Sequence, residues 1–148
     1  MRHIINQKLS SLWLILSISA VTGCSSLIDK YDQVAYQNAT SIKVESLALM
    51  DKATSSYSDN ETAVDELIIK VDKAYEYANG RPNNEIVTKQ WVIMKDPSRN
   101  LLGGFLVRWK EKGSLSKTFV IEAKKNVSFG FDQIIGLESG KIKPEGSK

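Results

Sequence analysis

The fold follows from the stretch VDELIIKVDKAYEYA, residues 64–78. Its apolar residues recur every three or four positions, which places them on one broad face of an α-helix: Val64, Leu67, Ile68, Val71, Ala74, Tyr75 and Ala78. Ser58-Asp59-Asn60-Glu61 matches a capping box and predicts where this helix begins. Asn79-Gly80, followed by Pro82, predicts where it ends. A helix with one apolar face has to pack against other elements, so the pattern predicts a helical bundle.

The same spacing extends upstream of this helix, from Leu27 to Tyr57. It predicts a helix of about 45 Å if the helix is unbroken, with these apolar positions: Ile28, Tyr31, Val34, Ala35, Ala39, Ile42, Leu47, Leu49, Met50, Ala53 and Tyr57. The short connection between the two helices predicts an antiparallel hairpin.

Three further helices are predicted downstream. A short one begins near Asn83 or Asn84 and presents Ile86, Val87, Trp91 and Met94. Asp96-Pro97 predicts the next start, because aspartate suits the N-cap and proline suits the first helical position; this helix runs to Gly113 with Leu101, Leu102, Phe105 and Trp109 facing inward. The last begins at Ser114 or Ser116 and ends near Ser139, before Gly140, with an inward face of Phe119, Val120, Ala123, Val127, Phe131 and Ile134.

The fold class is therefore all-α: a small bundle of about five helices in one domain over residues 27–140, with residues 141–148 as a disordered tail. A β-hairpin in 105–131 is the alternative. Residues 118–121 and 127–131 suit strands, with 124–126 as a turn. The apolar positions keep a helical phase across this region, which favours the helix.

The N-terminal segment has the pattern of an export signal. Basic Arg2 and Lys8 precede an apolar run at 9–21, which at 13 residues is shorter than the roughly 20 that cross a bilayer. Small residues and Cys24, the only cysteine, follow the run.

Val21-Thr22-Gly23-Cys24 resembles the lipobox that signal peptidase II cleaves in bacterial lipoproteins. The resemblance implies removal of residues 1–23 by a cut between Gly23 and Cys24. It also implies lipidation of Cys24, by a diacylglyceryl thioether and an acyl chain such as palmitate, with 24–26 as a short tether. Ser25, in place of an aspartate, points to the outer membrane.

Composition limits the chemistry of such a mature chain. Cleavage leaves 148 − 23 = 125 residues with 18 basic and 17 acidic side chains, a net charge of +1, which argues against nucleic-acid binding. His3, the only histidine, leaves with the signal, and lipid occupies the Cys24 thiol. Triads that use histidine, thiol chemistry, disulfides and ordinary zinc sites are then excluded, and we expect no cofactor.

Two features of the mature chain are candidate sites. Gly103 and Gly104 lie inside a predicted helix, where each glycine costs about 1 kcal/mol relative to alanine. They predict close packing against a side chain such as Trp91 or Phe119, a kink, or a contact notch that also includes Phe105 and Trp109. The second feature is a basic, aromatic patch at 108–112, joined by Lys124 and Lys125 and diluted by Glu111 and Glu122.

These observations predict a lipid-anchored envelope lipoprotein that acts as a non-catalytic binding or structural component, such as an accessory subunit or an exclusion or immunity factor. Its expected partners are the bilayer, through Cys24, and another envelope protein. One alternative is a cell-wall glycan hydrolase that uses paired carboxylates, although the acidic residues of 64–78 fall on the polar face: Asp65, Glu66, Asp72 and Glu76. The other is a carrier with an apolar cavity among Trp91, Leu102, Phe105 and Phe119.

Overall fold

The computed structural model describes residues 31–143, and every regular element in that range is helical. The α-helices are α2 (Gln33–Asp51), α3 (Glu61–Asn79), α4 (Glu85–Lys95), α5 (Leu102–Lys112) and α6 (Lys117–Glu138), with two 3₁₀ turns, η1 (Lys52–Thr54) and η2 (Ser58–Asn60). The all-α prediction is confirmed, and the alternative β-hairpin in 105–131 is wrong because α5 and α6 occupy that region. No helix within 31–143 is long and apolar enough to span a membrane.

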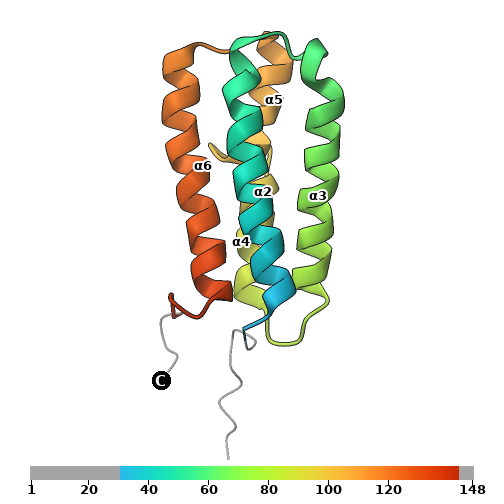
Figure 1. Ribbon diagram of the computed structural model, residues 1–148, viewed down its shortest axis with the longest axis vertical. Coiled ribbons are helices and arrows are strands. Elements are labelled where there is room, and N and C mark those ends of the chain that lie inside the picture. The colour runs from blue at the N-terminus through green and yellow to red at the C-terminus, as the bar shows by residue number, and fades with distance from the viewer. Residues whose placement is uncertain (1–30, 144–148) are drawn as a thin grey trace, which may run out of the picture.

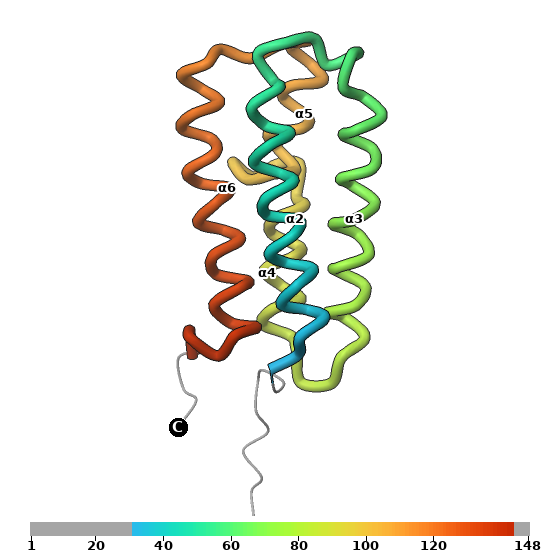
Figure 2. Tube along the Cα trace, viewed as in Figure 1, coloured from blue at the N-terminus to red at the C-terminus, as the bar shows by residue number. Residues whose placement is uncertain are grey.

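The helices form a four-column bundle in which α4 and α5 share one column (Figure 1). The chain runs up α2, down α3, up α4 and then α5, and down α6, so α2 and α3 form the predicted antiparallel hairpin. α2 packs against α3 and α6, and α4 packs against the same two helices from behind. Between α4 and α5 the trace leaves the column sideways over residues 96–101 (Figure 2).

Both ends of the described chain, residues 31 and 143, lie at one end of the bundle, here called the terminal end (Figure 1). The opposite end, here called the loop end, carries the connections 52–60 and 113–116. These two connections are tied together by backbone hydrogen bonds: the Tyr57 amide donates to the Gly113 carbonyl at 2.7 Å, and the Leu115 amide donates to the Ala53 carbonyl at 2.8 Å. The loop end is therefore closed by hydrogen bonds between segments far apart in sequence.

The core is one apolar cluster to which every α-helix contributes, as the spacing predicted, but three of the predicted apolar positions, Tyr31, Val34 and Ile68, are exposed. Its largest fully buried side chains include Trp109, Phe131, Met50 and Met94. Trp91 meets Phe131 edge-on, with 6.0 Å between ring centroids. The predicted inward positions of α4 and α6 are buried with one exception in each, since Ile86 and Phe119 are half-buried.

The helix that was predicted to begin at Asp96-Pro97 begins five residues after Pro97, at Leu102. The Asp96 carboxylate accepts the Ser98 amide at 2.8 Å and the Ser98 hydroxyl at 2.7 Å. The side chain thus closes a turn two residues ahead instead of capping a helix. Asp96 and Pro97 suit either structure, so the local signal was real but the element was misidentified.

The connection between α2 and α3 also differs from the prediction. The first helix ends at Asp51 and gives way to η1, so Tyr57 lies outside it. No capping box forms: α3 begins at Glu61 without a side-chain cap, and the side-chain Nδ2 of Asn60 donates back to the Ser56 carbonyl at 2.9 Å. The 3₁₀ turn η2 brings Tyr57 under Trp109, where the rings meet edge-on with 5.5 Å between centroids.

Other predicted helix ends are confirmed. Ser116 caps α6 by accepting the Phe119 amide, and Asn84 is the residue before α4. Gly140, with φ of 71°, follows the end of α6 in the left-handed conformation that favours glycine. Within the tail, the Ile142 amide donates to the Gly136 carbonyl at 2.9 Å and its side chain packs on that glycine. Residues 144–148 lie outside the described range.

Candidate binding groove beside α5

The double glycine lets the α4–α5 linker fold back onto α5. A Cβ atom added to Gly104 would lie 1.9 Å from the Arg99 carbonyl oxygen, and one added to Gly103 would lie 2.2 Å from the Lys95 carbonyl oxygen. Close packing on the glycines was predicted correctly, but the predicted neighbours, Trp91 or Phe119, were wrong. The backbone at the end of α4 and in the linker covers the glycines, because the linker crosses the first turn of α5.

The folded-back linker, α5 and α6 together line a groove. The groove has a volume of about 650 Å³. Its floor is apolar, with buried Phe105 and Ala123 beside half-buried Leu101 and Phe119. Its rim is polar and carries Ser98, Arg99, Asn100, Arg108, Glu111, Lys112, Glu122 and Asn126. An apolar floor with a few polar groups around it is the usual composition of a binding site.

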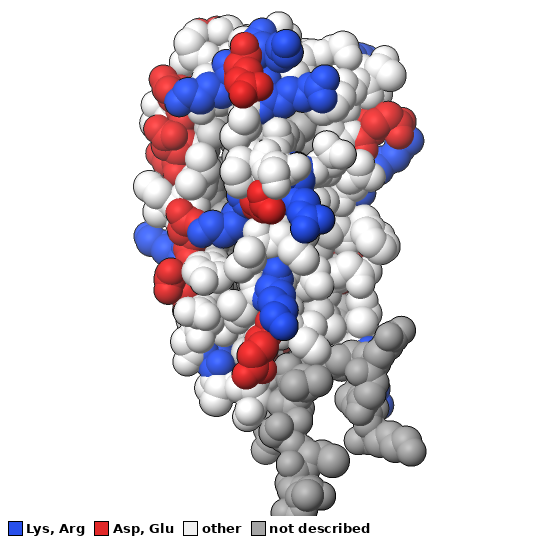
Figure 3. Space-filling model, turned by 180° about the vertical axis from the view of Figure 1, so that it is seen from behind, with Lys and Arg blue, Asp and Glu red and all other residues white. Residues whose placement is uncertain are grey.

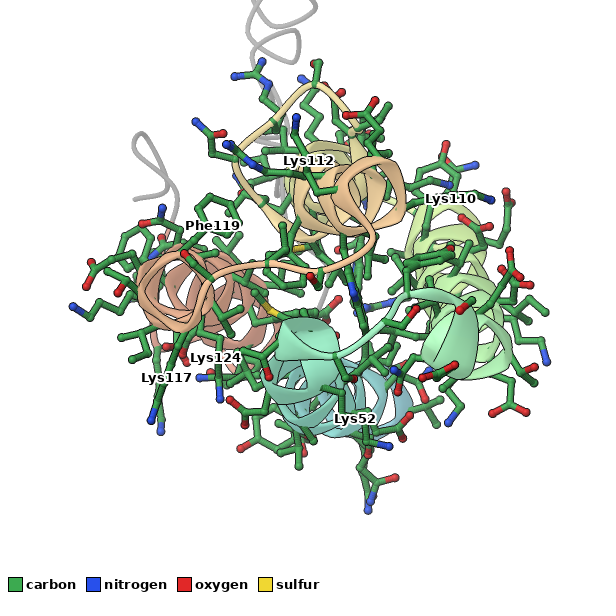
Figure 4. All side chains as sticks on the ribbon, turned by 90° about the horizontal axis from the view of Figure 1, so that it is seen from above. Lys52, Lys110, Lys112, Lys117, Phe119 and Lys124 are labelled. Carbon is green, nitrogen blue, oxygen red and sulfur yellow. The ribbon has the colours of Figure 1, made fainter. Side chains whose placement is uncertain are left out.

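Two aromatic rings and one guanidinium form the centre of the groove. The rings of Phe105 and Phe119 are stacked, with 6.1 Å between centroids and 6° between planes. The Arg108 guanidinium lies over the outer ring, 4.5 Å from the Phe119 centroid. Figure 4 shows Phe119 between α6 and α5, on the side of α5 that carries Lys112. A guanidinium over an aromatic face is held there by a cation–π attraction, and its N–H donors remain able to bind a ligand.

Basic side chains gather around the groove at the loop end. Between 108 and 125 there are six basic residues, Arg108, Lys110, Lys112, Lys117, Lys124 and Lys125, and two acidic ones, Glu111 and Glu122. Figure 3 shows Lys and Arg side chains at the end of the bundle away from the terminal segments, with Asp and Glu among them, and further Lys and Arg side chains along the same face. Of the predicted basic, aromatic patch, Arg108 and Lys112 line the groove, and the ring beside them is half-buried Phe119.

Ion pairs occupy three of these six cations, and on the groove rim Arg99 is paired with Asp96 at 3.6 Å. Lys110 pairs with Glu61 on α3, Lys124 with Asp51 on α2, and Lys125 with Glu122 on α6 itself. Lys117 and Lys124 point away from α5 in Figure 4. Within residues 31–143, neither Arg108 nor Lys112 has an acidic group at ion-pair distance.

Trp109, one of the four predicted notch residues, does not line the groove. It is fully buried, and its indole nitrogen donates to the Ser55 carbonyl at 3.2 Å, which joins α5 to the α2–α3 connection. The notch residues Gly104 and Phe105 do line the groove. Gly103 lies on the opposite side of α5, in a smaller hollow of about 300 Å³ against α3. The four predicted notch residues therefore lie in three different locations: the groove, the smaller hollow and the core.

The cavity that an apolar-ligand carrier needs is not formed by the predicted residues. Leu102 borders the hollow against α3, whereas Phe105 and Phe119 border the groove on the other side of α5. Trp91 is buried against Phe131. These side chains fill the core and separate the two hollows.

The acidic residues of α3 lie on its outer face, as predicted. Asp65, Glu66 and Glu76 are exposed, and Asp72 pairs with Lys95. Lys70 on the same helix donates to Glu45 on α2, and this hydrogen bond is the main cause of the raised pKa of Lys70. No group of three or more His, Cys, Asp or Glu side chains in 31–143 is arranged to hold a metal ion.

Two carboxylates, Glu111 and Glu122, do border the groove. Both are exposed, and Glu122 accepts from Lys125 at 2.7 Å. The general acid of a hydrolytic pair is usually a buried carboxyl group. Neither Glu111 nor Glu122 is buried.

A buried carboxyl group, that of Glu138, lies at the terminal end. It was not identified from the sequence. Glu138 is buried against Arg81, with 2.7 Å between Arg81 Nη1 and Glu138 Oε2 and side-chain exposures of 2% and 10%. Burial raises the pKa of Glu138, and the bond from Arg81 partly offsets this rise. Buried Asn84 donates to the Ala78 carbonyl beside this pair. The three residues stand at helix ends, where polar side chains are ordinarily solvated, so their pattern gave no signal.

The terminal end is further tied by Asp32. Its carboxylate caps α2 by accepting the Ala35 amide at 2.8 Å and also accepts the Tyr77 hydroxyl at 3.0 Å. These bonds lower the pKa of Asp32 and raise the pKa of Tyr77. The start of α2 is thus joined to the end of α3, next to the Arg81–Glu138 pair.

The lipobox residues, including Gly23, Cys24 and Ser25, lie outside the described residues. Comparison of the chain with protein-family models, with curated proteins and with solved structures found no match.

Proposed function

We propose that this chain is a bacterial envelope lipoprotein, lipidated on Cys24 and held at the outer membrane, that works by contact with another envelope protein and without catalysis. The observation that carries the proposal is the groove beside α5, which lies toward the loop end while residue 31 lies at the terminal end. A bundle tethered through residues 24–30 would present its groove away from the tether.

The dimensions support this arrangement. α6 has 22 residues and is about 33 Å long at 1.5 Å per residue. Seven residues, 24–30, reach about 25 Å when fully extended. A groove formed near the first turns of α6 is then displaced from the anchored end by most of the length of the bundle.

The test is site-specific photo-crosslinking in the native envelope. A photoreactive phenylalanine analogue replaces Asn126, an exposed residue on the groove rim, or Val44, an exposed residue on α2 that does not border the groove. We expect a discrete crosslinked product from position 126 and none from position 44. Equal products from both positions, or none from position 126, would contradict the proposed contact.

The anchor is tested separately, by labelling with palmitate and fractionation of the membranes. Label in the wild-type chain and in the outer-membrane fraction is the expected result. Label found only in the inner-membrane fraction would remove the outer-membrane location and leave the anchor in place.

A further inference from the structure

We infer that the groove beside α5 binds an extended, acidic segment of a partner protein, in which carboxylates alternate with apolar side chains. The inference rests on the proposed function and adds the chemistry of the ligand. It follows from three properties of the groove: the sign of its charge, the shape of its floor and its distance from both described ends of the chain.

The charge selects an anionic ligand. Arg108 and Lys112 border the groove against Glu111, while the other charged rim residues are already paired, Arg99 with Asp96 and Glu122 with Lys125. The Arg108 guanidinium lies over the Phe119 ring, 4.5 Å from its centroid, at the edge of the groove. A planar guanidinium is suited to bind a carboxylate with two parallel hydrogen bonds.

The floor selects apolar side chains between the charges. Phe105, Phe119 and Ala123 come from two helices and form a continuous apolar strip below the cations. A highly charged polymer without apolar groups would leave this strip uncovered. An extended peptide places successive side chains on opposite sides, so one set can enter the strip while the other meets the rim.

The described ends of this chain, residues 31 and 143, lie at the terminal end, whereas the groove lies toward the loop end. Head groups of the anchoring membrane lie on the same far side if the bundle stands on its tether. The occupant is therefore a separate molecule, and a peptide fits both the floor and the rim.

The test measures binding of a defined peptide to the full-length lipoprotein in nanodiscs of zwitterionic lipid. The probe is a fluorescein-labelled peptide of alternating glutamate and leucine, read by fluorescence anisotropy, with empty nanodiscs as background. The comparison peptides replace every glutamate with lysine, or every leucine with serine. We expect the glutamate–leucine peptide to bind most tightly and to weaken as salt concentration rises.

Variants locate the binding. Arg108→Glu should weaken binding of the glutamate–leucine peptide at least tenfold. Arg108→Lys should weaken binding less, because lysine keeps the positive charge and loses only the planar, two-pronged hydrogen-bonding group. Lys73→Glu, on the exposed face of α3, changes net charge by the same amount outside the groove and should leave binding unchanged. Circular dichroism of each variant confirms that the helices remain.

Three results would overturn the inference. They are equal binding of the glutamate and lysine peptides, equal effects of Arg108→Glu and Lys73→Glu, or binding of the groove to phosphatidylglycerol vesicles with no binding to any peptide. Sequencing the product crosslinked to position 126 separates this inference from the proposed function. An acidic, partly apolar peptide supports both. A discrete protein product without acidic residues overturns the ligand chemistry and leaves the contact function standing, whereas absence of any product overturns both.

Discussion

Gly104→Ala should destabilise the bundle, although alanine is the better helix former. The new Cβ would lie 1.9 Å from the Arg99 carbonyl oxygen, and real Cβ atoms stay beyond 3.0 Å, so backbone has to move by about 1.1 Å. The obstacle is a carbonyl of the linker, which has no rotamer to change. Overpacking of this kind costs about 3 kcal/mol at the upper end of its usual range.

The helical preference of alanine offsets part of this cost. Replacing glycine by alanine inside a helix contributes about 1 kcal/mol of stability, which leaves a net loss of about 2 kcal/mol. For a domain of this size that loss corresponds to a decrease in melting temperature of about 8 °C. The measurement is thermal and urea unfolding followed by circular dichroism at 222 nm.

Gly130→Ala is the matched control, because this glycine also lies inside a helix and also has close neighbours. Its added Cβ would meet the Met94 Cε at 2.7 Å and the Leu101 Cδ2 at 3.3 Å, both at the ends of flexible side chains. Side-chain adjustment and helical preference should roughly cancel, which leaves stability within about 1 kcal/mol of wild type. If Gly104→Ala proves as stable as Gly130→Ala, the linker does not press on α5 as described.

Three further predictions concern the anchor, the buried ion pair and the loop end. Cys24→Ser should leave an unprocessed precursor that takes up no labelled palmitate; incorporation of label would refute lipidation at this residue. Arg81→Met should cost about 3 kcal/mol near pH 8, since it leaves the Glu138 carboxylate buried without that guanidinium. In this variant the pKa of Glu138, already raised by burial, rises further. A carboxyl group whose pKa is raised in the folded state makes stability fall as pH rises from its unfolded-state pKa toward its folded-state pKa. The loss of unfolding free energy in urea should therefore be smaller at pH 5 than at pH 8, and equal losses would contradict the burial argument. Trp109→Phe should cost about 1 kcal/mol or more by leaving the Ser55 carbonyl without its indole donor, and an unchanged urea midpoint would show that this bond contributes nothing.

The sequence predicted those parts of the fold that depend on local periodicity. α3, α4 and α6 appear close to their predicted bounds, because apolar spacing and helix ends such as Asn84, Ser116 and Gly140 are properties of short stretches. The prediction was wrong where one local signal serves two structures. Asp96 can accept an amide hydrogen in a turn as readily as in a helix cap, and only the path of the linker across Gly103 and Gly104 decides between them.

The candidate site was predictable only in part, for a related reason. The glycine pair was recognisable as a costly feature that needs compensation, and one of the two, Gly104, lines the groove. The pairing of Arg108 with Phe119 joins two helices and follows from how far α5 is displaced from α6, which no spacing along one helix records. Trp109 looked like a notch residue because it follows Phe105 at helical spacing, yet its indole is used to hold the loop end.

The backbone hydrogen bonds that close the loop end have a mechanical consequence. On the proposed anchoring, a partner held in the groove and a lipid held in the membrane pull on opposite ends of one bundle. The tension enters through α5 and α6 and leaves through α2, so the bonds from Tyr57 to Gly113 and from Leu115 to Ala53 lie across its path. The time that the bundle withstands such a pull is set by its rate of unfolding rather than by its equilibrium stability. When a cell stretches or divides, the hydrogen bonds at the loop end would therefore bear the tension before the apolar core does.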